Sequence, residues 1–200
     1  MTRIGILGAG GIGQAFAGHM ANAGYDVILS NSRGPDSLTE AVKRIGARAR
    51  AGTREQAAQS DIVFLAVPWP EVPLALSDLP PWNNRILIDA TNPVLQPGFR
   101  LAELGGRNSS EVVAAAAPGA RVVKTANTLL RAVLASDPRQ NGGQRVLFVS
   151  GDDSAANAIV SQMLQKAGFA VIDLGRLTVG GYLQQFPGGP LATLNLIKLG

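Results

Sequence analysis

The stretch GAGGIG, residues 8–13, constrains this chain more than any other feature, because it satisfies the glycine pattern G-x-G-x-x-G. It follows an apolar run that predicts a strand over 3–7, and it opens a helical apolar pattern that ends at Gly24. A second strand is predicted over 26–30, which completes a strand–helix–strand unit of about thirty residues. In this context the pattern predicts a dinucleotide-binding turn, the alternative being a glycine turn with a structural role alone.

Each glycine of the pattern has a physical role in such a turn. Gly8 permits the tight turn, Gly10 lets a pyrophosphate approach the backbone, and Gly13 lets the helix pack closely on the strand. The free N–H groups and the positive end of the helix dipole would then face the phosphates. With Gly11, which lies in the same turn, these glycines are the first candidate cofactor-binding residues.

The end of the second strand predicts which dinucleotide is bound. An NAD-preferring site usually places Asp or Glu about 20 residues beyond the glycines, on the ribose 2′-hydroxyl. Positions 27–35 contain no acid; the chain reads Ser30, Asn31, Ser32 and Arg33 instead. Hydroxyls, an amide and a guanidinium suit a 2′-phosphate, so the pattern predicts NADP(H). The alternative is an exposed loop arginine without a ligand.

Strands and helices alternate along the rest of the first two thirds of the chain. This alternation predicts right-handed crossovers and an α/β fold, a Rossmann-type doubly wound parallel sheet with a small C-terminal α/β extension. We expect a dinucleotide-binding domain over 1–127 and a small acceptor-side domain over 128–200. A capping box of Ser37 and Glu40 is predicted to begin the second helix. Further strands are predicted near 47–51 and over 62–67, 85–90, 121–126, 145–150 and 169–173, and helices from Thr53, around 109–117 and over 153–167.

Composition narrows the class of protein. The hydrophobic content of 46% is that of a globular chain, and no apolar run approaches the ~20 residues needed to cross a bilayer. The 18 basic residues exceed the 14 acidic ones, but the arginines are dispersed, so we expect no nucleic-acid partner. The first residues lead directly into a strand without a signal-peptide pattern, so a cytoplasmic location is expected. The chain has no cysteine and one histidine, and no metal site is predicted.

Five short motifs, taken in order, carry a resemblance to a known family. They are the glycine turn, Ser32-Arg33, Val67-Pro68-Trp69, Val122-Val123-Lys124-Thr125 and Ser150-Gly151-Asp152-Asp153. Over nearly all 200 residues the chain resembles the NADPH-dependent deazaflavin (coenzyme F420) reductases, a family that is itself similar to the cytosolic domain of transmembrane ferric reductases. The resemblance implies hydride transfer between NADPH and a flavin or deazaflavin-like acceptor, a C-terminal extension over the nicotinamide, and a homodimer.

The resemblance also implies roles for single residues. Gly8, Gly10 and Gly13 would bind the pyrophosphate, with Ile12 above it, and the loop Asn31-Ser32-Arg33 would bind the 2′-phosphate. Val67, Pro68 and Trp69 would border the nicotinamide half, and Thr125, Ala126 and Asn127 would lie at the nicotinamide itself. An alternative role for Trp69 is a hydrophobic lid on the sheet.

No side chain is predicted to be an acid–base catalyst, because cofactors carry the chemistry of hydride transfer. His19 is expected to be exposed in the middle of a helix. Asp89 is expected to cap a helix or form a turn, and Lys124 to pack or form an ion pair.

The glycine-rich stretch Val179–Pro190 is predicted to border the acceptor pocket. Within it, Tyr182 and Phe186 would share a face if the stretch were helical. The expected partner is a small-molecule electron acceptor. Two other functions stay open, a non-catalytic NADPH-binding sensor and a reductase of a small imine or carbonyl substrate.

Overall fold

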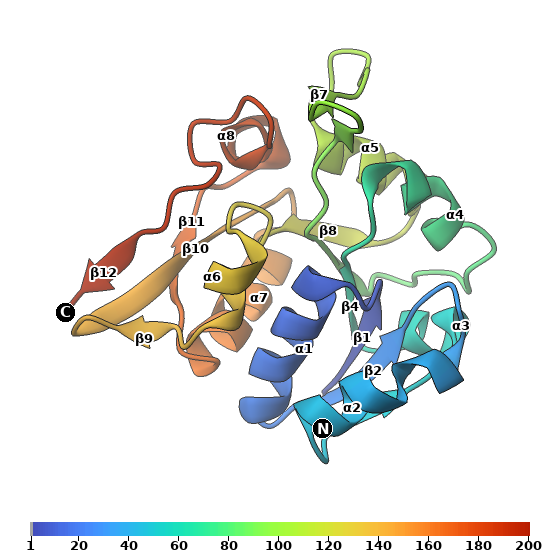
Figure 1. The fold of residues 1–200 in the computed structure, drawn as a ribbon. Coiled ribbons are helices and arrows are strands. Elements are labelled where there is room, and N and C mark those ends of the chain that lie inside the picture. The colour runs from blue at the N-terminus through green and yellow to red at the C-terminus, as the bar shows by residue number, and fades with distance from the viewer. Residues whose placement is uncertain (1) are drawn as a thin grey trace.

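The central sheet of the computed structural model, which describes residues 2–200, has the strand order β11-β10-β8-β5-β4-β1-β2-β3 (Figure 1). β9 and β12 are added on β10, and β6 and β7 form a separate two-stranded hairpin. The strands are β1 (Arg3–Leu7), β2 (Asp26–Ser30), β3 (Ala49–Ala51), β4 (Ile62–Leu65), β5 (Ile86–Asp89), β6 (Val94–Leu95), β7 (Arg100–Leu101), β8 (Arg121–Lys124), β9 (Arg139–Gln140), β10 (Gly143–Gly151), β11 (Ala170–Asp173) and β12 (Ile197–Leu199).

The helices lie mostly between these strands in the chain, as the alternating pattern predicts. The α-helices are α1 (Gly11–Asn22), α2 (Thr39–Ile45), α3 (Arg54–Ala58), α4 (Val72–Leu76), α5 (Ser109–Ala116), α6 (Arg131–Ala135), α7 (Ser154–Lys166) and α8 (Tyr182–Gln184). Two 3₁₀ turns, η1 (Pro35–Leu38) and η2 (Trp69–Glu71), and one π-helical turn, η3 (Leu177–Gly181), complete the elements.

Six neighbouring strands of the sheet run parallel, in the order β8-β5-β4-β1-β2-β3, so their carboxyl ends share one edge of the sheet. Leu7 at the end of β1 is paired with Ser30 at the end of β2 and with Leu65 at the end of β4. The order reverses at β1, which is the topological switch point where open α/β sheets bind ligands. The predicted Rossmann-type fold is confirmed.

Alternation along the strands divides the core between the two faces of the sheet. Ile6 and Phe64 belong to the core that α1, α2, α6 and α7 cover, whereas Leu7 and Val63 face α3, α4 and α5. The ring of Phe16 on α1 stacks on Phe64 with the centroids 3.8 Å apart, which fixes α1 over the middle of the sheet. A strand covered on both faces must be apolar throughout, and this explains the unbroken apolar runs of the sequence.

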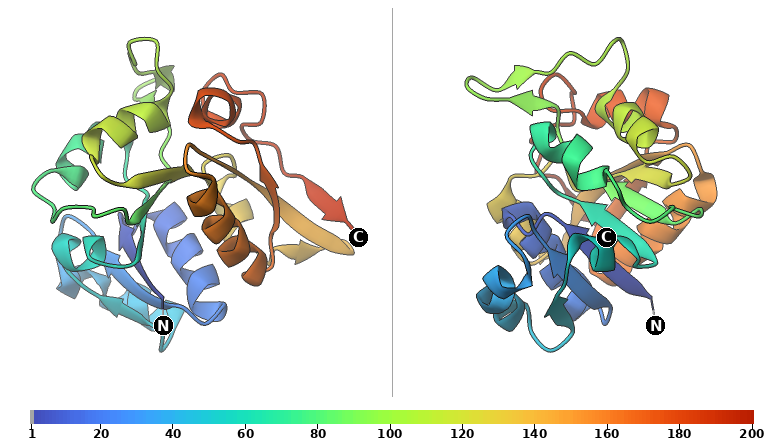
Figure 2. Two further views of the ribbon diagram at one scale, coloured as in Figure 1. Left: turned by 180° about the vertical axis from the view of Figure 1, so that it is seen from behind. Right: turned by 90° about the vertical axis from the view of Figure 1, so that its right-hand side faces the viewer.

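The C-terminal extension joins the edge of the parallel sheet in the antiparallel direction. β10 pairs antiparallel with β8, through Ser150 and Lys124, a direction that the sequence pattern leaves open. Its first half runs beyond the end of β8, and Figure 2 shows it extending side by side with β12 to the C-terminus. Strands from both sides of residue 127 thus share one sheet, and the division into two domains stays a prediction.

One local prediction is wrong, and the helical condition for Tyr182 and Phe186 to share a face is not met. Ser37 lies inside η1, its hydroxyl donates to the carbonyl of Gly34, and α2 begins after Leu38 without a side-chain cap, so the predicted capping box with Glu40 does not form. Tyr182 and Phe186 do not share a helical face, because α8 ends at Gln184 and Gln185 is extended. Pro35 explains the absent capping box, since it favours a tight turn directly before the helix.

Candidate dinucleotide-binding site

The glycine turn joins β1 to α1 with the geometry that its residues predict. Gly8 has a φ of +102°, and a Cβ there would lie 2.5 Å from the carbonyl oxygen of Ala66. A Cβ at Gly13 would collide with the carbonyl oxygen of Gly8, so only glycine lets α1 pack this closely. Gly10 is exposed, and a Cβ added to it would meet no atom within 4 Å. The turn is therefore tight beneath Gly8 and Gly13 and open above Gly10.

The N-terminus of α1 fits an anionic group. Gly10 precedes the helix and supplies no side-chain cap, and the first turn contains no acidic residue. Gln14 steadies the turn, because its Nε2 donates to the carbonyl oxygen of Ala9 at 2.7 Å. Its Oε1 accepts from Arg44 on α2 at 3.1 Å. The N–H groups of the first turn and the open space at Gly10 form a cradle suited to a pyrophosphate.

The loop after β2 presents Arg33 and Ser32 to solvent beside this turn. Ser30 is buried and its hydroxyl donates to the carbonyl oxygen of Ile6 at 2.8 Å, so it is not available to a phosphate, contrary to our expectation. Asn31 is a turn former, since its Oδ1 accepts from the backbone N–H of Arg33 at 3.0 Å. The side chain of Arg33 has no hydrogen bond or ion pair with any of the residues described in the structure. The loop thus offers one free guanidinium and no carboxylate.

The segment after β4 borders the other side of the switch point. Val67 lies against Gly8: a Cβ added to Gly8 would be 2.8 Å from Cγ1 of Val67. Val67 and Trp69 are half-buried and pack on the core beneath α4, while Pro68 between them is exposed. This packing agrees with the lid interpretation of Trp69. Contact of these three residues with a nicotinamide stays a prediction.

The end of β8 is strained and holds unpaired polar atoms. Ala126 is buried and has a φ of +59°, a left-handed conformation that costs a residue with a side chain about 1–2 kcal/mol. On either side, Thr125 Oγ1 and Asn127 Oδ1 are buried and find no hydrogen-bond partner within residues 2–200. Strain and unpaired buried groups occur often at binding sites, and contact of these three residues with a nicotinamide stays a prediction.

A buried network beneath this edge joins β5, β8 and α5. The carboxylate of Asp89 accepts from the N–H and hydroxyl of Thr91, from the hydroxyl of Ser110 and from Lys124. Asp89 therefore forms the expected turn, and Lys124 forms the expected ion pair. Lys124 also donates to the carbonyl oxygen of Thr91 and to Ser109 Oγ, both at 3.1 Å. Every donor of its ammonium group is used, which identifies the network as a support of the strand ends.

The C-terminal tail is held against the same edge. Asn127 Nδ2 donates to the carbonyl oxygen of Gln184 at 2.7 Å, and the backbone N–H of Phe186 donates to Asn92 Oδ1 at 3.1 Å. The ring of Phe186 meets the ring of Phe99, from the β6–β7 hairpin, edge to face with the centroids 6.2 Å apart. Hairpin and tail rise on the same side of the sheet (Figures 1 and 2). Part of the stretch Val179–Pro190 thus lies beside the predicted nicotinamide residues.

His19 is not exposed as expected. It is half-buried on α1, and its Nε2 lies 2.6 Å from the carbonyl oxygen of Leu134 on α6, which requires a proton on Nε2. Burial lowers the pKa of His19 from its ordinary value, with the hydrogen bond to Leu134 opposing the shift. Its position between two helices indicates a structural role.

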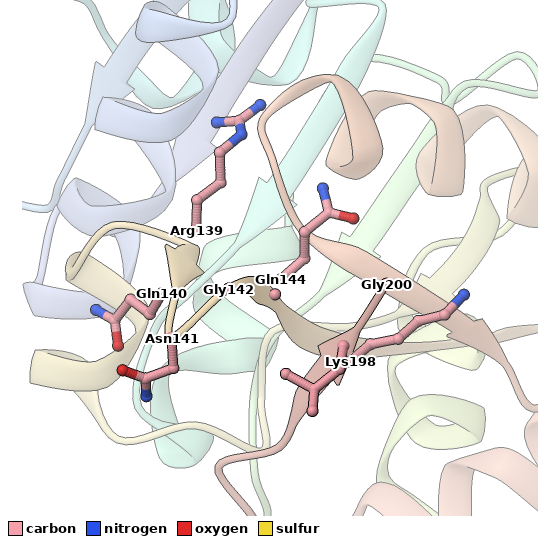
Figure 3. Close-up of a pocket in the computed structure, with 9 residues that line it drawn as sticks. Arg139, Gln140, Asn141, Gly142, Gln144, Lys198 and Gly200 are labelled. Carbon is pink, nitrogen blue, oxygen red and sulfur yellow. The ribbon is translucent and has the colours of Figure 1, made fainter.

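Two surface hollows lie away from the glycine turn. One, of about 600 Å³, is built by the β9–β10 turn and β12 (Figure 3). The other, of about 530 Å³, lies between His19, Arg139 and Lys166. Neither includes a predicted site residue in its lining. Residues 2–200 contain no cluster of three or more metal-ligating side chains. None of the helices described there is both long enough and apolar enough to cross a membrane.

The fold and its glycine turn define a Rossmann-type protein, and a family model matches the first part of the chain. Residues 3–93 match the family model described as NADP oxidoreductase, coenzyme F420-dependent. Residues 3–93 therefore carry the NADP oxidoreductase domain of this family, as the resemblance in the motifs predicted.

Two solved structures are similar over most of their length. A hypothetical protein from Sinorhizobium meliloti is 45% identical, with a TM-score of 0.94, over 99% of this chain and 96% of that one. A protein provisionally described as an F420-dependent NADP reductase, from Arthrobacter sp. FB24, is 28% identical, with a TM-score of 0.75, over 89% of this chain and 86% of that one.

A curated relative is much longer than this chain. The rat metalloreductase STEAP3 is 26% identical over 186 residues, which are 92% of this chain but only 36% of that protein. The matched region thus corresponds to one part of a larger enzyme.

Proposed function

We propose that this protein is an NADP(H)-dependent oxidoreductase that transfers hydride between NADPH and a flavin or deazaflavin-like acceptor. The observation that carries the proposal is the pairing of an open glycine turn with a carboxylate-free loop at the switch point. Gly10 leaves room above the N-terminus of α1, and the unpaired guanidinium of Arg33 lies on the neighbouring loop. A 2′-phosphate needs such a cation, whereas a ribose hydroxyl would favour a carboxylate.

The chain's own residues would bind and orient the cofactor. NADPH, when bound, would supply the hydride for reduction of the acceptor. Arg33 would neutralise the 2′-phosphate, and the N–H groups of α1 would hold the pyrophosphate. Thr125 and Asn127 would offer their buried unpaired oxygens to the nicotinamide end. Alignment of the two rings is the main task left to the protein.

The aromatic residues where the tail meets the β6–β7 hairpin favour an acceptor with a planar ring. Phe99 and Phe186 form an aromatic pair next to Asn92, and the exposed fraction of Phe99 is 60%. Aromatic surface of this kind stacks on flat conjugated rings. The description of the family and that of the Arthrobacter relative both name coenzyme F420, which favours a deazaflavin within this class of acceptors.

The decisive experiment measures cofactor binding and acceptor reduction separately. Calorimetric titration with NADPH and NADH should show a clear preference for NADPH. Absorbance of NADPH should then fall on addition of FMN, FAD, riboflavin or coenzyme F420, with the acceptor reduced in equal amount. Tight NADPH binding without oxidation by any of the four would support a sensor instead. Oxidation only with a ketone and an amine would support an imine or carbonyl reductase.

We include the homodimer and the cytoplasmic location in the proposal, because the resemblance and the sequence predict them. Sedimentation at micromolar concentration tests the first, and localisation of a tagged chain in its own cell tests the second.

A further inference from the structure

Gly11 is a glycine that the dinucleotide pattern does not require. The pattern needs glycine at 8, 10 and 13, and position 11 accepts other residues. In this structure a Cβ at Gly11 would collide with Cδ of Arg131 and would lie 2.7 Å from its Cγ. The aliphatic stem of Arg131 thus lies across the first turn of α1. The stem of Arg131 occupies the space that a larger side chain at position 11 would need.

Arg131 begins α6, and this helix is firmly attached beside α1 (Figure 1). Leu134 on α6 is fully buried, and its carbonyl oxygen receives the hydrogen bond from His19. The buried guanidinium of Arg145 donates to the carbonyl oxygen of Val133 at 3.2 Å. The imidazole of His19 and the guanidinium of Arg145 therefore both bind carbonyl oxygens near the end of α6, where the positive charge of Arg145 is also favourable. The helix that carries Arg131 is fixed relative to the glycine turn.

The guanidinium of Arg131 is left free by this arrangement. Its side chain is exposed, and within residues 2–200 it has no hydrogen bond and no ion pair. Its Nε lies 3.1 Å from the position that a Cβ at Gly11 would take, so the guanidinium lies next to the first turn of α1. The stem of Arg131 lies against the first turn of α1 and its fork is unpaired, so its guanidinium is placed beside the N–H groups that would hold an anion.

We propose that Arg131 binds the diphosphate bridge of the dinucleotide and holds it against the N-terminus of α1. The inference rests on the proposed function, because it assigns a further residue to the same cofactor site. The pyrophosphate would receive N–H groups from α1 beneath it and charge-assisted N–H bonds from Arg131 at its side. Arg33 and Arg131 would then bind different phosphates of one ligand, the 2′-phosphate and the diphosphate.

Two ligands separate these roles. NADP⁺ carries both the 2′-phosphate and the diphosphate, whereas adenosine 2′-monophosphate carries the first alone. Arg131→Gln should weaken NADP⁺ binding about ten- to a hundredfold, the range of a lost charge-assisted bond. Its affinity for adenosine 2′-monophosphate should equal that of the wild type. Arg131→Lys keeps the charge without the fork and should lie between the two. Arg139→Gln, which removes an exposed arginine at the hollow of Figure 3, is the matched control and should leave both affinities unchanged.

The outcomes distinguish this inference from the proposed function. Calorimetric titration measures each affinity, and thermal unfolding should give both Arg131 variants the wild-type midpoint, because the side chain is exposed. Wild-type affinity of Arg131→Gln for NADP⁺ would overturn the role of Arg131 and leave the proposed function intact. Equal weakening of both ligands would place Arg131 elsewhere and also overturn it. A wild-type protein that binds neither NADP⁺ nor NADPH would overturn both.

Discussion

The ammonium group of Lys124 lies 3.3 Å from Asp89 Oδ2, and neither side chain has any exposed surface. The pair links β5 to β8 directly beneath the residues predicted to meet the nicotinamide. Removing one partner leaves a buried charge unpaired, which typically costs 3–5 kcal/mol. We therefore expect Lys124→Met to lower the free energy of unfolding by about 3–5 kcal/mol, as measured by urea denaturation.

The double variant Lys124→Met with Asp89→Leu is the control for this prediction. It removes both charges, so its loss should be smaller than that of Lys124→Met alone. A single variant that loses less than about 1 kcal/mol would show that the pair is solvated and structurally unimportant.

Much of this fold could be predicted because it depends on local patterns. The glycine turn, the apolar strands and the glycine after α1 each report on a few neighbouring residues, and the structure has them within a few positions. The direction of β10 could not be predicted. It depends on pairing between Ser150 and Lys124, residues 26 positions apart whose side chains do not encode the direction of the pairing.

The same distinction applies to the candidate site. Arg33 could be predicted as a candidate because its distance from the glycines is set by one strand–helix–strand unit. The proposed role of Arg131 could not be predicted, because its approach to Gly11 depends on how α6 packs on α1, and nothing in the sequence near it signals that contact. The second of two consecutive glycines, outside the required pattern, was the one local signal of a close neighbour.

Gly10 and Gly13 offer a matched pair of variants. Gly10 has a φ of −73° and open space around it, so Gly10→Val should keep the wild-type thermal midpoint while abolishing NADPH binding. Gly13→Ala places a methyl group against the carbonyl oxygen of Gly8 and should destabilise the protein by about 1–3 kcal/mol. Thermal unfolding and NADPH titration of both variants test the contrast. Normal NADPH affinity of Gly10→Val would mean that the phosphates bind elsewhere.

Arg33 is expected to determine the choice between the two nicotinamide cofactors. Replacing it by alanine removes an exposed, unpaired guanidinium, so the fold should not change. NADPH binding should weaken by about 1.5–3 kcal/mol, the value of a hydrogen bond to a charged group, and NADH binding should stay nearly unchanged. Titration of Arg33→Ala with each cofactor measures this. Equal weakening of the two would contradict the assignment of the 2′-phosphate to this loop.

His19 is expected to make stability depend on pH just below neutrality. Burial lowers the pKa of His19 in the folded state, whereas an unfolded histidine titrates near about 6.5. Just below that pH the unfolded state binds more protons, so the free energy of unfolding should fall as the pH falls through about 6.5. His19→Gln keeps a donor for the carbonyl oxygen of Leu134 but binds no proton, and it should remove this part of the loss. Urea denaturation at several pH values tests this, and identical pH profiles would refute it.

Phe186 is expected to affect the acceptor but not the cofactor. Its backbone N–H is bonded to Asn92, so its position is fixed at the edge of the sheet, and its ring faces Phe99 rather than the core. Phe186→Ala and Phe99→Ala should each raise the KM for a flavin or deazaflavin several-fold, because a stacking surface is worth about 0.5–1.5 kcal/mol. The Kd for NADPH should not change. Leu199→Ala is the control, since Leu199 is 66% exposed on β12 and lines the hollow built by β12 and the β9–β10 turn. Steady-state kinetics that vary the acceptor at saturating NADPH measure the effect. A rise in the Kd for NADPH with an unchanged acceptor KM would place this aromatic pair on the cofactor instead, and the acceptor would then have to approach from another side of the nicotinamide.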